Sequence, residues 1–332
     1  DYHYRARMTG SVLTGMQDLA NACETAFGSL VGKTVIDIGC NDGSLLDCFK
    51  EKGCKTLGIE PTNAVQDANH ETINAYFDDK SANEALGLVG SPDIITFTNV
   101  FAHIEDLPKL LENLKLLMSV KTKLVIENHY LGAVLDYGQF DTFYHEHPRT
   151  YSAKSFKYIA ESLNCKLNAV QFVTRYGGNI RAFIQKQGVN CDLPDESSFP
   201  EKMAGLQQHA DEWLQKTRSL LDRLVEKYGA LPAKAFPGRA AILIKMLGLS
   251  VNEISAVYEI KGSIKVQNYV PGTRIPILPE ADLYVQDKLN VPIINLAWHI
   301  GLEVRKNLEK NRFFNEVIDI KPFKKYHLKE VR

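Results

Sequence analysis

The stretch VIDIGCNDG at residues 35–43 decides the fold, because an apolar run ends there in a turn that carries two glycines. Gly39 lets the chain turn tightly as it leaves a strand, and it lets the backbone approach a ligand. Glu60 ends the next strand-like run, 21 positions after Gly39. An acid at this place accepts hydrogen bonds from both hydroxyls of a ribose. The stretch therefore predicts a Rossmann-like unit with a ligand site at its first turn.

The spacing of the glycines indicates which ligand this is. A dinucleotide fingerprint, G-x-G-x-x-G, has a second glycine where this chain has Asn41, and the next glycine here is Gly43. With Asp37 in front, the pattern D-x-G-x-x-x-G favours S-adenosylmethionine, because Asp37 can take up the cationic amino group of the methionine part. The alternative is an ordinary strand, turn and helix without a ligand. The predicted cofactor-binding residues are Asp37, Gly39, Asn41, Gly43, Glu60 and Asn99.

Strands and helices alternate through the first half of the chain, which predicts a parallel sheet with helices on both faces. Two later strand-like runs, 167–174 and 179–186, flank Gly177-Gly178 and predict an antiparallel hairpin. A parallel sheet that ends in such a hairpin is typical of class I methyltransferases. The predicted strands are 34–38, 55–60, 93–100 and 122–127, and the predicted helices are 12–27, 44–52, 62–69, 81–89, 105–120 and 152–163.

A length of 332 residues favours two domains. We predict an S-adenosylmethionine-binding methyltransferase domain at 1–190, a linker and long helix at 191–229, and a smaller Rossmann-like α/β domain at 230–332. Within the last domain, Gly238 and Glu259 repeat the spacing of Gly39 and Glu60. This spacing is compatible with a second nucleotide-binding unit, but one glycine and one acid also match by accident. Helices are expected at 200–228, from 238 and at 299–311, and strands at 254–259 and 291–297.

Composition excludes several classes of partner. A formal net charge of −1 gives no reason to expect nucleic acid or an anionic membrane. No run approaches the roughly 18 apolar residues of a membrane-spanning helix. The six cysteines are scattered without a C-x-x-C pair, which indicates reduced thiols and a cytoplasmic protein. The chain opens at Asp1, so a removed targeting segment stays an open alternative. We expect a small-molecule substrate. The sequence does not indicate an oligomeric state.

Five further stretches carry a family likeness: GIEP at 58–61, NVFAHI at 99–104, FDTFYHEH at 140–147, YGGNIR at 176–181 and VPGT at 270–273. In them the sequence resembles the C-methyltransferases that act on nucleotide-linked 4-keto deoxysugars in bacterial sugar biosynthesis. The likeness covers most of the chain, and its most specific part is YHEH.

The chain departs from this family in three places. The usual N-terminal four-cysteine zinc module has no counterpart among the cysteines of this sequence. Arg5-Ala6-Arg7 stand where serines usually follow the tyrosines represented here by Tyr2 and Tyr4. Phe236-Pro237-Gly238-Arg239 replace a glycine-rich turn. These departures affect the expected identity of the substrate more than that of the cofactor.

Transfer of a methyl cation to carbon needs a nucleophilic carbon, which forms beside a ketone when a base removes a proton. Histidine, with an unperturbed pKa of about 6.5, is available as that base at neutral pH. Hydrogen-bond donors must then stabilise the enolate oxygen. The resemblance implies His147 as the base, Glu146 as a supporting carboxylate, and Tyr144 and His103 as groups that place or polarise the ketone. It also implies substrate contacts by Tyr4, Asn179 and Arg181.

Each of these residues has a plainer interpretation. His145-Glu146-His147 is a possible metal site, but Pro148 disfavours a helical zinc motif and no third ligand is evident, so we predict no metal. His103 is also placed to cap a helix, and Arg181 to form a surface ion pair. The alternative functions are an O- or N-methyltransferase on a related sugar or small molecule, and a non-catalytic module that binds a nucleotide sugar or cofactor. Identification of the methylated atom in the product separates the first two.

Overall fold

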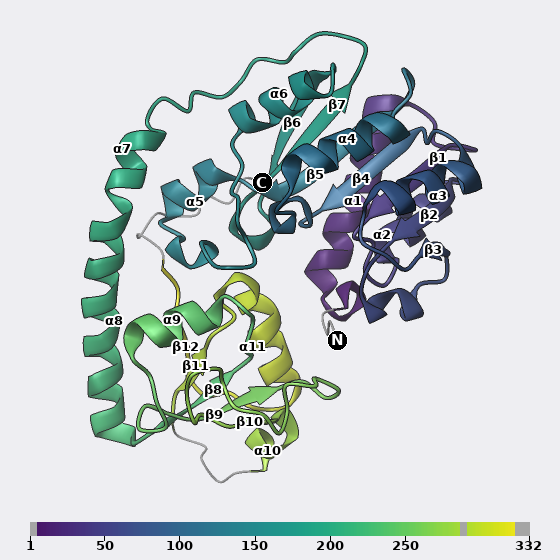
Figure 1. Ribbon diagram of the computed structural model, residues 1–332. Helices are drawn as coiled ribbons and strands as arrows, with labels where there is room; N and C mark the ends of the chain where they lie inside the picture. Colours follow the sequence, from purple (N-terminus) through teal and green to yellow (C-terminus); the bar gives the residue numbers. More distant parts are fainter. Residues whose placement is uncertain (1–4, 286–290, 323–332) are drawn as a thin grey trace. The chain divides into compact units, whose positions relative to one another are not determined.

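The computed structural model describes residues 5–285 and 291–322, and the chain divides into two compact units (Figure 1). The first unit contains residues 1–133 and 145–196, and the second contains residues 134–144 and 197–332. This division differs from our prediction in three places, the first being that residues 197–229, predicted as part of a separate linker and long helix, belong to the second unit. The segment 134–144, expected in the first domain, joins the second unit, and residues 191–196 stay with the first.

The first unit is built on a seven-stranded sheet with the order β3-β2-β1-β4-β5-β7-β6. Strands β1 to β5 pair in parallel, while β7 runs antiparallel to both β5 and β6. This arrangement confirms the predicted Rossmann-like sheet that ends in an antiparallel hairpin. The strands are β1 (Thr34–Ile38), β2 (Lys55–Ile59), β3 (Glu71–Ile73), β4 (Ile94–Thr98), β5 (Lys123–His129), β6 (Lys166–Val173) and β7 (Asn179–Gln185).

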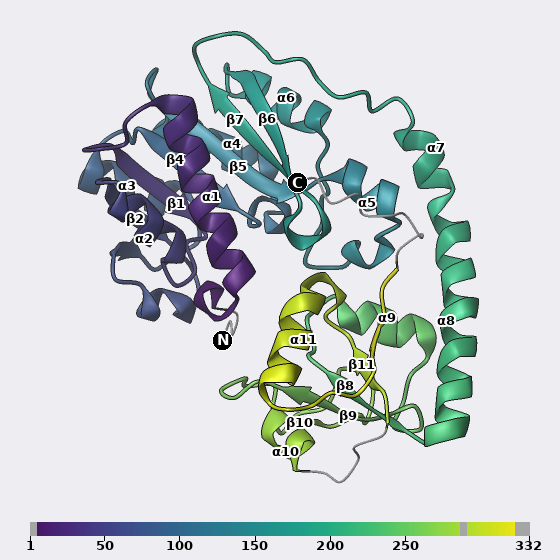
Figure 2. The same ribbon diagram turned by 180° about the vertical axis from the view of Figure 1, so that it is seen from behind.

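Helices cover both faces of this sheet because successive strand residues point to opposite sides. Val35 packs into a core with α1 and α2, whereas Ile36 and Ile38 pack into a core with α3, α4 and α6. Figure 2 shows α1 in front of the sheet, and Figure 1 shows α4 in front of the other face. These helices are α1 (Gly10–Phe27), α2 (Ser44–Glu51), α3 (Asp79–Val89), α4 (Leu107–Leu117) and α6 (Ala153–Ser162), with α5 (Leu131–Tyr137) after β5.

The second unit has its own parallel sheet of five strands in the order β10-β9-β8-β11-β12. It confirms the predicted smaller C-terminal α/β domain. Its strands are β8 (Leu231–Lys234), β9 (Ile254–Glu259), β10 (Ile277–Pro279), β11 (Ile293–Asn295) and β12 (Val317–Asp319), and its helices are α7 (Phe199–Ala204), α8 (Leu206–Tyr228), α9 (Ala240–Leu247), α10 (Glu280–Tyr284) and α11 (Gly301–Lys310).

A buried ion pair explains why the segment 134–144 belongs to the second unit. The Asp141 carboxylate is fully buried and accepts hydrogen bonds from Arg239 Nε at 2.9 Å and Nη2 at 2.8 Å. Trp298 Nε1 donates to the same carboxylate at 2.8 Å, and the Arg239 guanidinium lies 4.6 Å from the Trp298 ring centroid. Thr142 Oγ1 also accepts from Arg239 at 2.7 Å. These contacts join residues 97 to 157 positions apart, beyond the reach of local sequence patterns.

Two predicted helices differ from the structure in type or continuity. The helix expected at 62–69 is a short 3-10 helix at Asn63–Asp67, where the Thr62 side chain accepts from Ala64 N, and the edge strand β3 follows it. The long helix expected at 200–228 is two helices, α7 and α8, that meet at Gly205. All six cysteines are free. Among the described residues, no helix is both long and apolar enough to cross a membrane.

We predict that Asp141→Asn lowers the free energy of unfolding by about 3 kcal/mol, because it leaves the Arg239 charge buried without its counter-ion. Urea denaturation should show an earlier midpoint. The matched control is Glu212→Gln, which breaks a solvent-exposed pair with Lys216 and should change stability by less than about 1 kcal/mol. Equal stability of the two variants would contradict the role given to Asp141.

Candidate cofactor and catalytic site

The turn after β1 has a backbone that favours glycine at two positions. Gly39 and Gly43 have φ of 76° and 78°, and Asn41 between them has φ of 51°. A Cβ at Gly39 would lie 2.3 Å from Val100 Cγ2. A larger residue at position 39 would therefore strain the backbone and collide with the turn after β4. Glycine leaves the backbone of this turn bare enough for close approach by a ligand.

Glu60, at the end of β2, is held in one orientation by two backbone groups. It is buried, its Oε2 accepts from Asn41 N at 2.9 Å, and its Oε1 accepts from Thr62 N at 2.9 Å. Each carboxylate oxygen has lone-pair capacity beyond one bond. Glu60 can therefore accept further hydrogen bonds from a pair of hydroxyls, as a ribose presents them.

Asp37 lies on the same strand as the turn and is almost fully buried. Burial raises the pKa of Asp37 to about 7, a hydrogen bond from Thr96 Oγ1 at 2.6 Å opposes this rise, and the charge of Glu60 adds to it. A carboxyl in this state gains most from a nearby cation. It fits the ammonium of an amino acid part.

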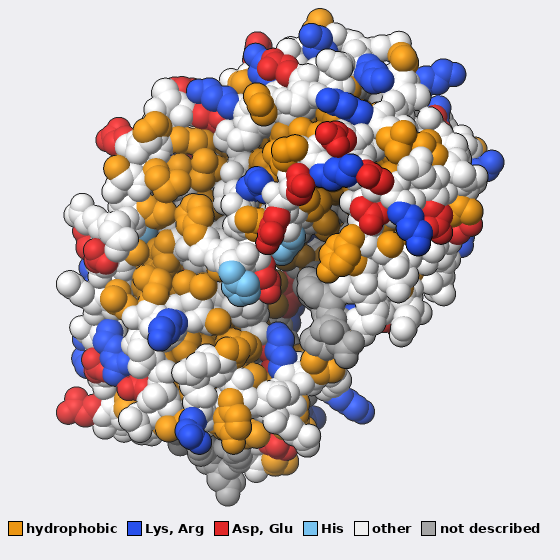
Figure 3. Space-filling view, viewed as in Figure 1, with side chains coloured by type: hydrophobic (Ala, Val, Ile, Leu, Met, Phe, Trp, Pro, Cys, Tyr) orange, Lys and Arg blue, Asp and Glu red, His pale blue; other side chains and the backbone are white. Residues whose placement is uncertain are grey.

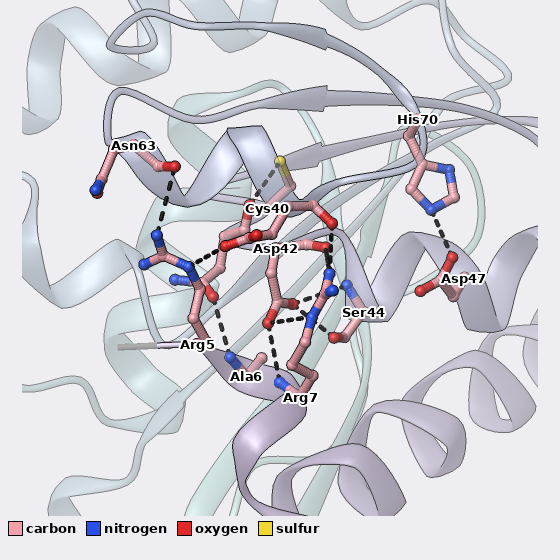
Figure 4. A network of polar contacts seen from close by, with 11 residues as sticks. Arg5, Ala6, Arg7, Cys40, Asp42, Ser44, Asp47, Asn63 and His70 are labelled. Carbon is pink, nitrogen blue, oxygen red and sulfur yellow. Dashed lines mark hydrogen bonds and ion pairs between the residues drawn. The ribbon is translucent and has the colours of Figure 1, made fainter. Parts of the chain in front are cut away.

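The N-terminal segment holds the turn from the outside, as Figure 4 shows. Arg7 donates to Asp42 Oδ2 from its backbone N at 3.0 Å and from Nε at 3.1 Å, and to the Asp42 carbonyl from Nη2 at 2.8 Å. The Asp42 carboxylate is fully buried, and its Oδ1 accepts from Ser44 N and Oγ at the start of α2. Arg7 therefore supplies the counter-charge of a buried carboxylate in the turn.

Neighbouring residues of this segment make further contacts with the same region. Ala6 N donates to Asn41 Oδ1 at 3.0 Å, so Asn41 is held through both its side chain and its backbone N–H. Arg5 Nε donates to Asp67 Oδ2 at 2.6 Å. The sequence indicated residues 5–7 only as a departure from the family, and their contacts with Asn41, Asp42 and Asp67 were not predicted. The predicted substrate contact Tyr4 lies outside the described residues.

Three histidines of the first unit, His103, His129 and His147, lie close together near the carboxyl edge of the sheet. The ring centroid of His147 lies 4.7 Å from that of His103, which follows β4, and 5.3 Å from that of His129, which ends β5. Desolvation by the surrounding protein lowers the pKa of His103, while the Glu146 charge and backbone oppose this effect. His129 is a position for which the sequence suggested no role. Figure 3 shows histidine side chains at the surface beside acidic ones.

The rest of the YHEH stretch is more exposed. The Glu146 and His145 side chains are 52% and 87% exposed, and Glu146 Oε1 lies 4.0 Å from His145 Nε2. Tyr144 belongs to the second unit. The roles of Glu146 and Tyr144 remain predictions. Among the described residues, no group of three or more His, Cys, Asp or Glu is arranged to hold a metal ion.

Glu127, near the end of β5, organises the predicted substrate-binding residues. Arg181 is buried and donates to Glu127 Oε2 from Nε at 2.9 Å, while Asn179 Nδ2 donates to Glu127 Oε1 at 3.2 Å and to Asn99 Oδ1 at 3.0 Å. Arg181 therefore forms a buried ion pair, whereas the sequence suggested a surface pair as the alternative to substrate contact. Arg175 also binds Glu127 and was missed. The sequence did contain a signal for the ion pair with Arg181. Glu127 is a charged residue near the end of an otherwise apolar strand, and it pairs with Arg181 in the register of β5 and β7.

The second unit repeats one feature of the first. Glu259 Oε1, at the end of β9, accepts from Phe236 N at 2.5 Å, much as Glu60 accepts from Asn41. The intervening turn is less suited to a ligand, because Pro237 has no N–H and the Arg239 side chain is engaged by Asp141. A nucleotide site in this unit remains untested.

Comparisons with known proteins agree with this geometry. Residues 12–170 match a methyltransferase domain family, and residues 175–315 match the C-methyltransferase C-terminal domain family. The C-methyltransferase NovU of Streptomyces niveus is 26% identical over 325 residues, which cover 92% of this chain and 76% of NovU.

Solved structures resemble this chain over about half its length. Magnesium protoporphyrin IX methyltransferase from Synechocystis PCC 6803, with bound S-adenosylmethionine, has a TM-score of 0.39 and 15% identity over 53% of this chain and 79% of that chain. CalO1, a methyltransferase in calicheamicin biosynthesis, has a TM-score of 0.41 and 14% identity over 53% of this chain and 54% of that chain.

The two domain matches and the turn after β1 define an S-adenosylmethionine-dependent methyltransferase. Within this class, the chain is related to the C-methyltransferase NovU, and its residues 175–315 match the C-methyltransferase C-terminal domain family. S-Adenosylmethionine is its cofactor. The bare backbone at Gly39 allows close approach of this cofactor. The Glu60 carboxylate fits its ribose hydroxyls, and the Asp37 carboxyl fits its ammonium group.

We predict that affinity for S-adenosylhomocysteine rises with pH, by up to about tenfold per pH unit, below the Asp37 pKa of about 7. Above that pH the affinity should level off. Free Asp37 binds a proton below that pH, and an ammonium beside it requires the ionised form, so binding releases the proton. Calorimetry in buffers of different ionisation enthalpy measures this release. Asp37→Asn should remove the pH dependence, and a flat wild-type profile would contradict the assignment.

We also predict that Arg7→Ala weakens S-adenosylhomocysteine binding roughly tenfold, because it removes charge-assisted hydrogen bonds from the buried Asp42 and loosens the turn. The matched control is Arg5→Ala, since the Asp67 partner of Arg5 is 47% exposed and such pairs contribute little. Calorimetry compares the two variants. The same loss in both would show that the segment acts only through its bulk.

Proposed function

We propose that this enzyme transfers the methyl group of S-adenosylmethionine to a carbon beside a ketone of a nucleotide-linked sugar, with His147 as the base. The observation that carries the proposal is the meeting of His147 with His103 and His129. Relatedness to a C-methyltransferase and the YHEH resemblance support carbon as the acceptor. The free cysteines and the net charge of −1 are compatible with a cytoplasmic enzyme acting on a small molecule.

In this mechanism His147 takes a proton from the carbon beside the ketone, and the C–H electron pair moves into the enolate. The lowered pKa of His103 keeps its ring neutral at neutral pH. A neutral ring can donate one N–H to the developing oxyanion without itself being an acid strong enough to protonate it fully. Glu146 can stabilise the imidazolium that forms at His147.

The cofactor supplies an electrophilic methyl group on a sulfonium. In the proposed site Glu60 binds the ribose hydroxyls, Asp37 binds the ammonium, and the backbone around Gly39 and Asn41 lies against the ligand. Asn99 follows β4 at the same edge of the sheet, and its side chain is held by Asn179. Arg181 acts through Glu127 in this arrangement, because its guanidinium is committed to that carboxylate.

The test is deuterium exchange into a nucleotide-linked 4-keto deoxysugar with S-adenosylhomocysteine bound, followed by NMR. His147→Asn keeps the size of the side chain and some of its hydrogen bonding but cannot act as a base at neutral pH. We expect exchange and methylation to fall by about 100-fold or more. Affinity for S-adenosylhomocysteine should stay within about twofold, because the cofactor contacts are unchanged.

Retained cofactor binding shows that the variant is folded. His145→Asn is the matched control, because its side chain lies in the same stretch but is 87% exposed. It should keep most of the wild-type methylation rate. Full methylation by His147→Asn would rule out His147 as the base.

A further inference from the structure

The Glu127 carboxylate is paired with two guanidiniums, those of Arg175 and Arg181, and its single negative charge neutralises only one of them. Arg175 donates to Glu127 Oε1 from Nε at 3.0 Å and from Nη2. Arg181 donates to Oε2 from Nε at 2.9 Å, and its Nη2 lies 2.8 Å from the same oxygen. The three side chains are 0%, 8% and 4% exposed in the order Glu127, Arg175 and Arg181. One carboxylate between two guanidiniums leaves a surplus positive charge largely withdrawn from water. Such a surplus is costly unless an anion accompanies it.

This charge lies level with the cofactor turn. Asp37 pairs with Thr96 in the register of β1 and β4, so the next layer along the strands contains Gly39 and Thr98, and Thr98 pairs with Glu127 on β5. Neighbouring strands are about 4.8 Å apart, which puts β5 about 10 Å from β1. Asp37, Thr98 and Glu127 also share the face covered by α1, since residues two apart on a strand point the same way.

Two buried polar atoms at this place have no partner among the described residues. They are the Thr98 hydroxyl Oγ1 and the Asn179 amide oxygen Oδ1. Asn179 is 1% exposed, and its Nδ2 is already used by Glu127 and Asn99. A buried oxygen without a hydrogen bond costs about 1–3 kcal/mol, so these atoms point to a ligand with its own polar groups.

The position of Arg175 is prepared by α1. Arg175 Nη1 donates to Val12 O at 3.1 Å, and a Cβ on Gly15 would lie 2.5 Å from Nη1 and 2.8 Å from Cζ. Glycine inside a helix costs about 1 kcal/mol relative to alanine. At position 15 it makes room for the guanidinium, which lies against the helix backbone.

We propose that this is the binding site for the α-amino acid end of the cofactor, with Arg175 and Thr98 Oγ1 holding its carboxylate and Asn179 Oδ1 accepting from its ammonium. The carboxylate supplies the missing negative charge. Carboxylate and ammonium stand on one carbon, so a ligand whose ammonium reaches the Asp37 side of this face brings its carboxylate to the neighbouring strand. The inference rests on S-adenosylmethionine as cofactor and is independent of the sugar substrate and of His147.

The test compares two ligands by calorimetry: S-adenosylhomocysteine and its decarboxylated counterpart, S-adenosyl-3-thiopropylamine. Arg175→Gln should weaken binding of the first by about 10-fold to 100-fold, the scale of one or two charge-assisted hydrogen bonds. It should change binding of the decarboxylated ligand by less than about twofold to threefold, because that ligand has no carboxylate to lose.

Gly15→Ala tests the same site without removing the guanidinium, and it should give the same ligand-selective loss by displacing Arg175. Arg181→Gln is the matched control, since Arg181 also binds Glu127 but directs its Nη1 to Gln171. It should not discriminate between the two ligands. The proposal is overturned if Arg175→Gln and Gly15→Ala weaken both ligands equally, if they weaken neither, or if only sugar nucleotide binding falls.

Discussion

The parallel register of β1, β4 and β5 is the constraint on which the site depends. It places the turn at Gly39, the β4 end at Thr98 and the carboxylate of Glu127 in one layer across the sheet. The carboxyl ends of parallel strands form one edge, where ligands bind in open α/β sheets. Glu60 reaches this edge from β2, which pairs with β1 on its other side. Residues from four strands can therefore serve one cofactor.

Buried carboxylates then fix the loops that the sheet leaves free. Asp42 holds the N-terminal segment through Arg7, Glu127 holds the hairpin turn through Arg175, and Asp141 holds its own segment through Arg239. In each pair the carboxylate is fully buried. Removal of Arg7 or Arg239 would leave the buried charge of Asp42 or Asp141 uncompensated, whereas Glu127 would keep Arg181 as a counter-ion. These ion pairs therefore fix the positions of the loops more accurately than apolar packing alone would.

The sequence predicts well what depends on near neighbours. The turn at Gly39 and the acid at Glu60 lie within one strand–helix–strand unit, and apolar periodicity predicts most strands and helices of the first unit. Pairings such as Arg175 with Glu127 or Arg7 with Asp42 join residues 48 and 35 positions apart. No local pattern encodes which charges meet, so these pairings were missed. His103 and His147 were predicted from resemblance, whereas His129 joins them only because β5 ends beside them.

The central claim, that the acceptor is carbon, is tested most directly by the product. The enzyme is incubated with S-adenosylmethionine carrying a ¹³C-labelled methyl group and with a nucleotide-linked 4-keto deoxysugar, and the product is analysed by carbon–proton correlation NMR. Our account predicts a labelled methyl group bonded to a sugar ring carbon next to the carbonyl. A labelled methoxy or N-methyl group in the product would contradict it.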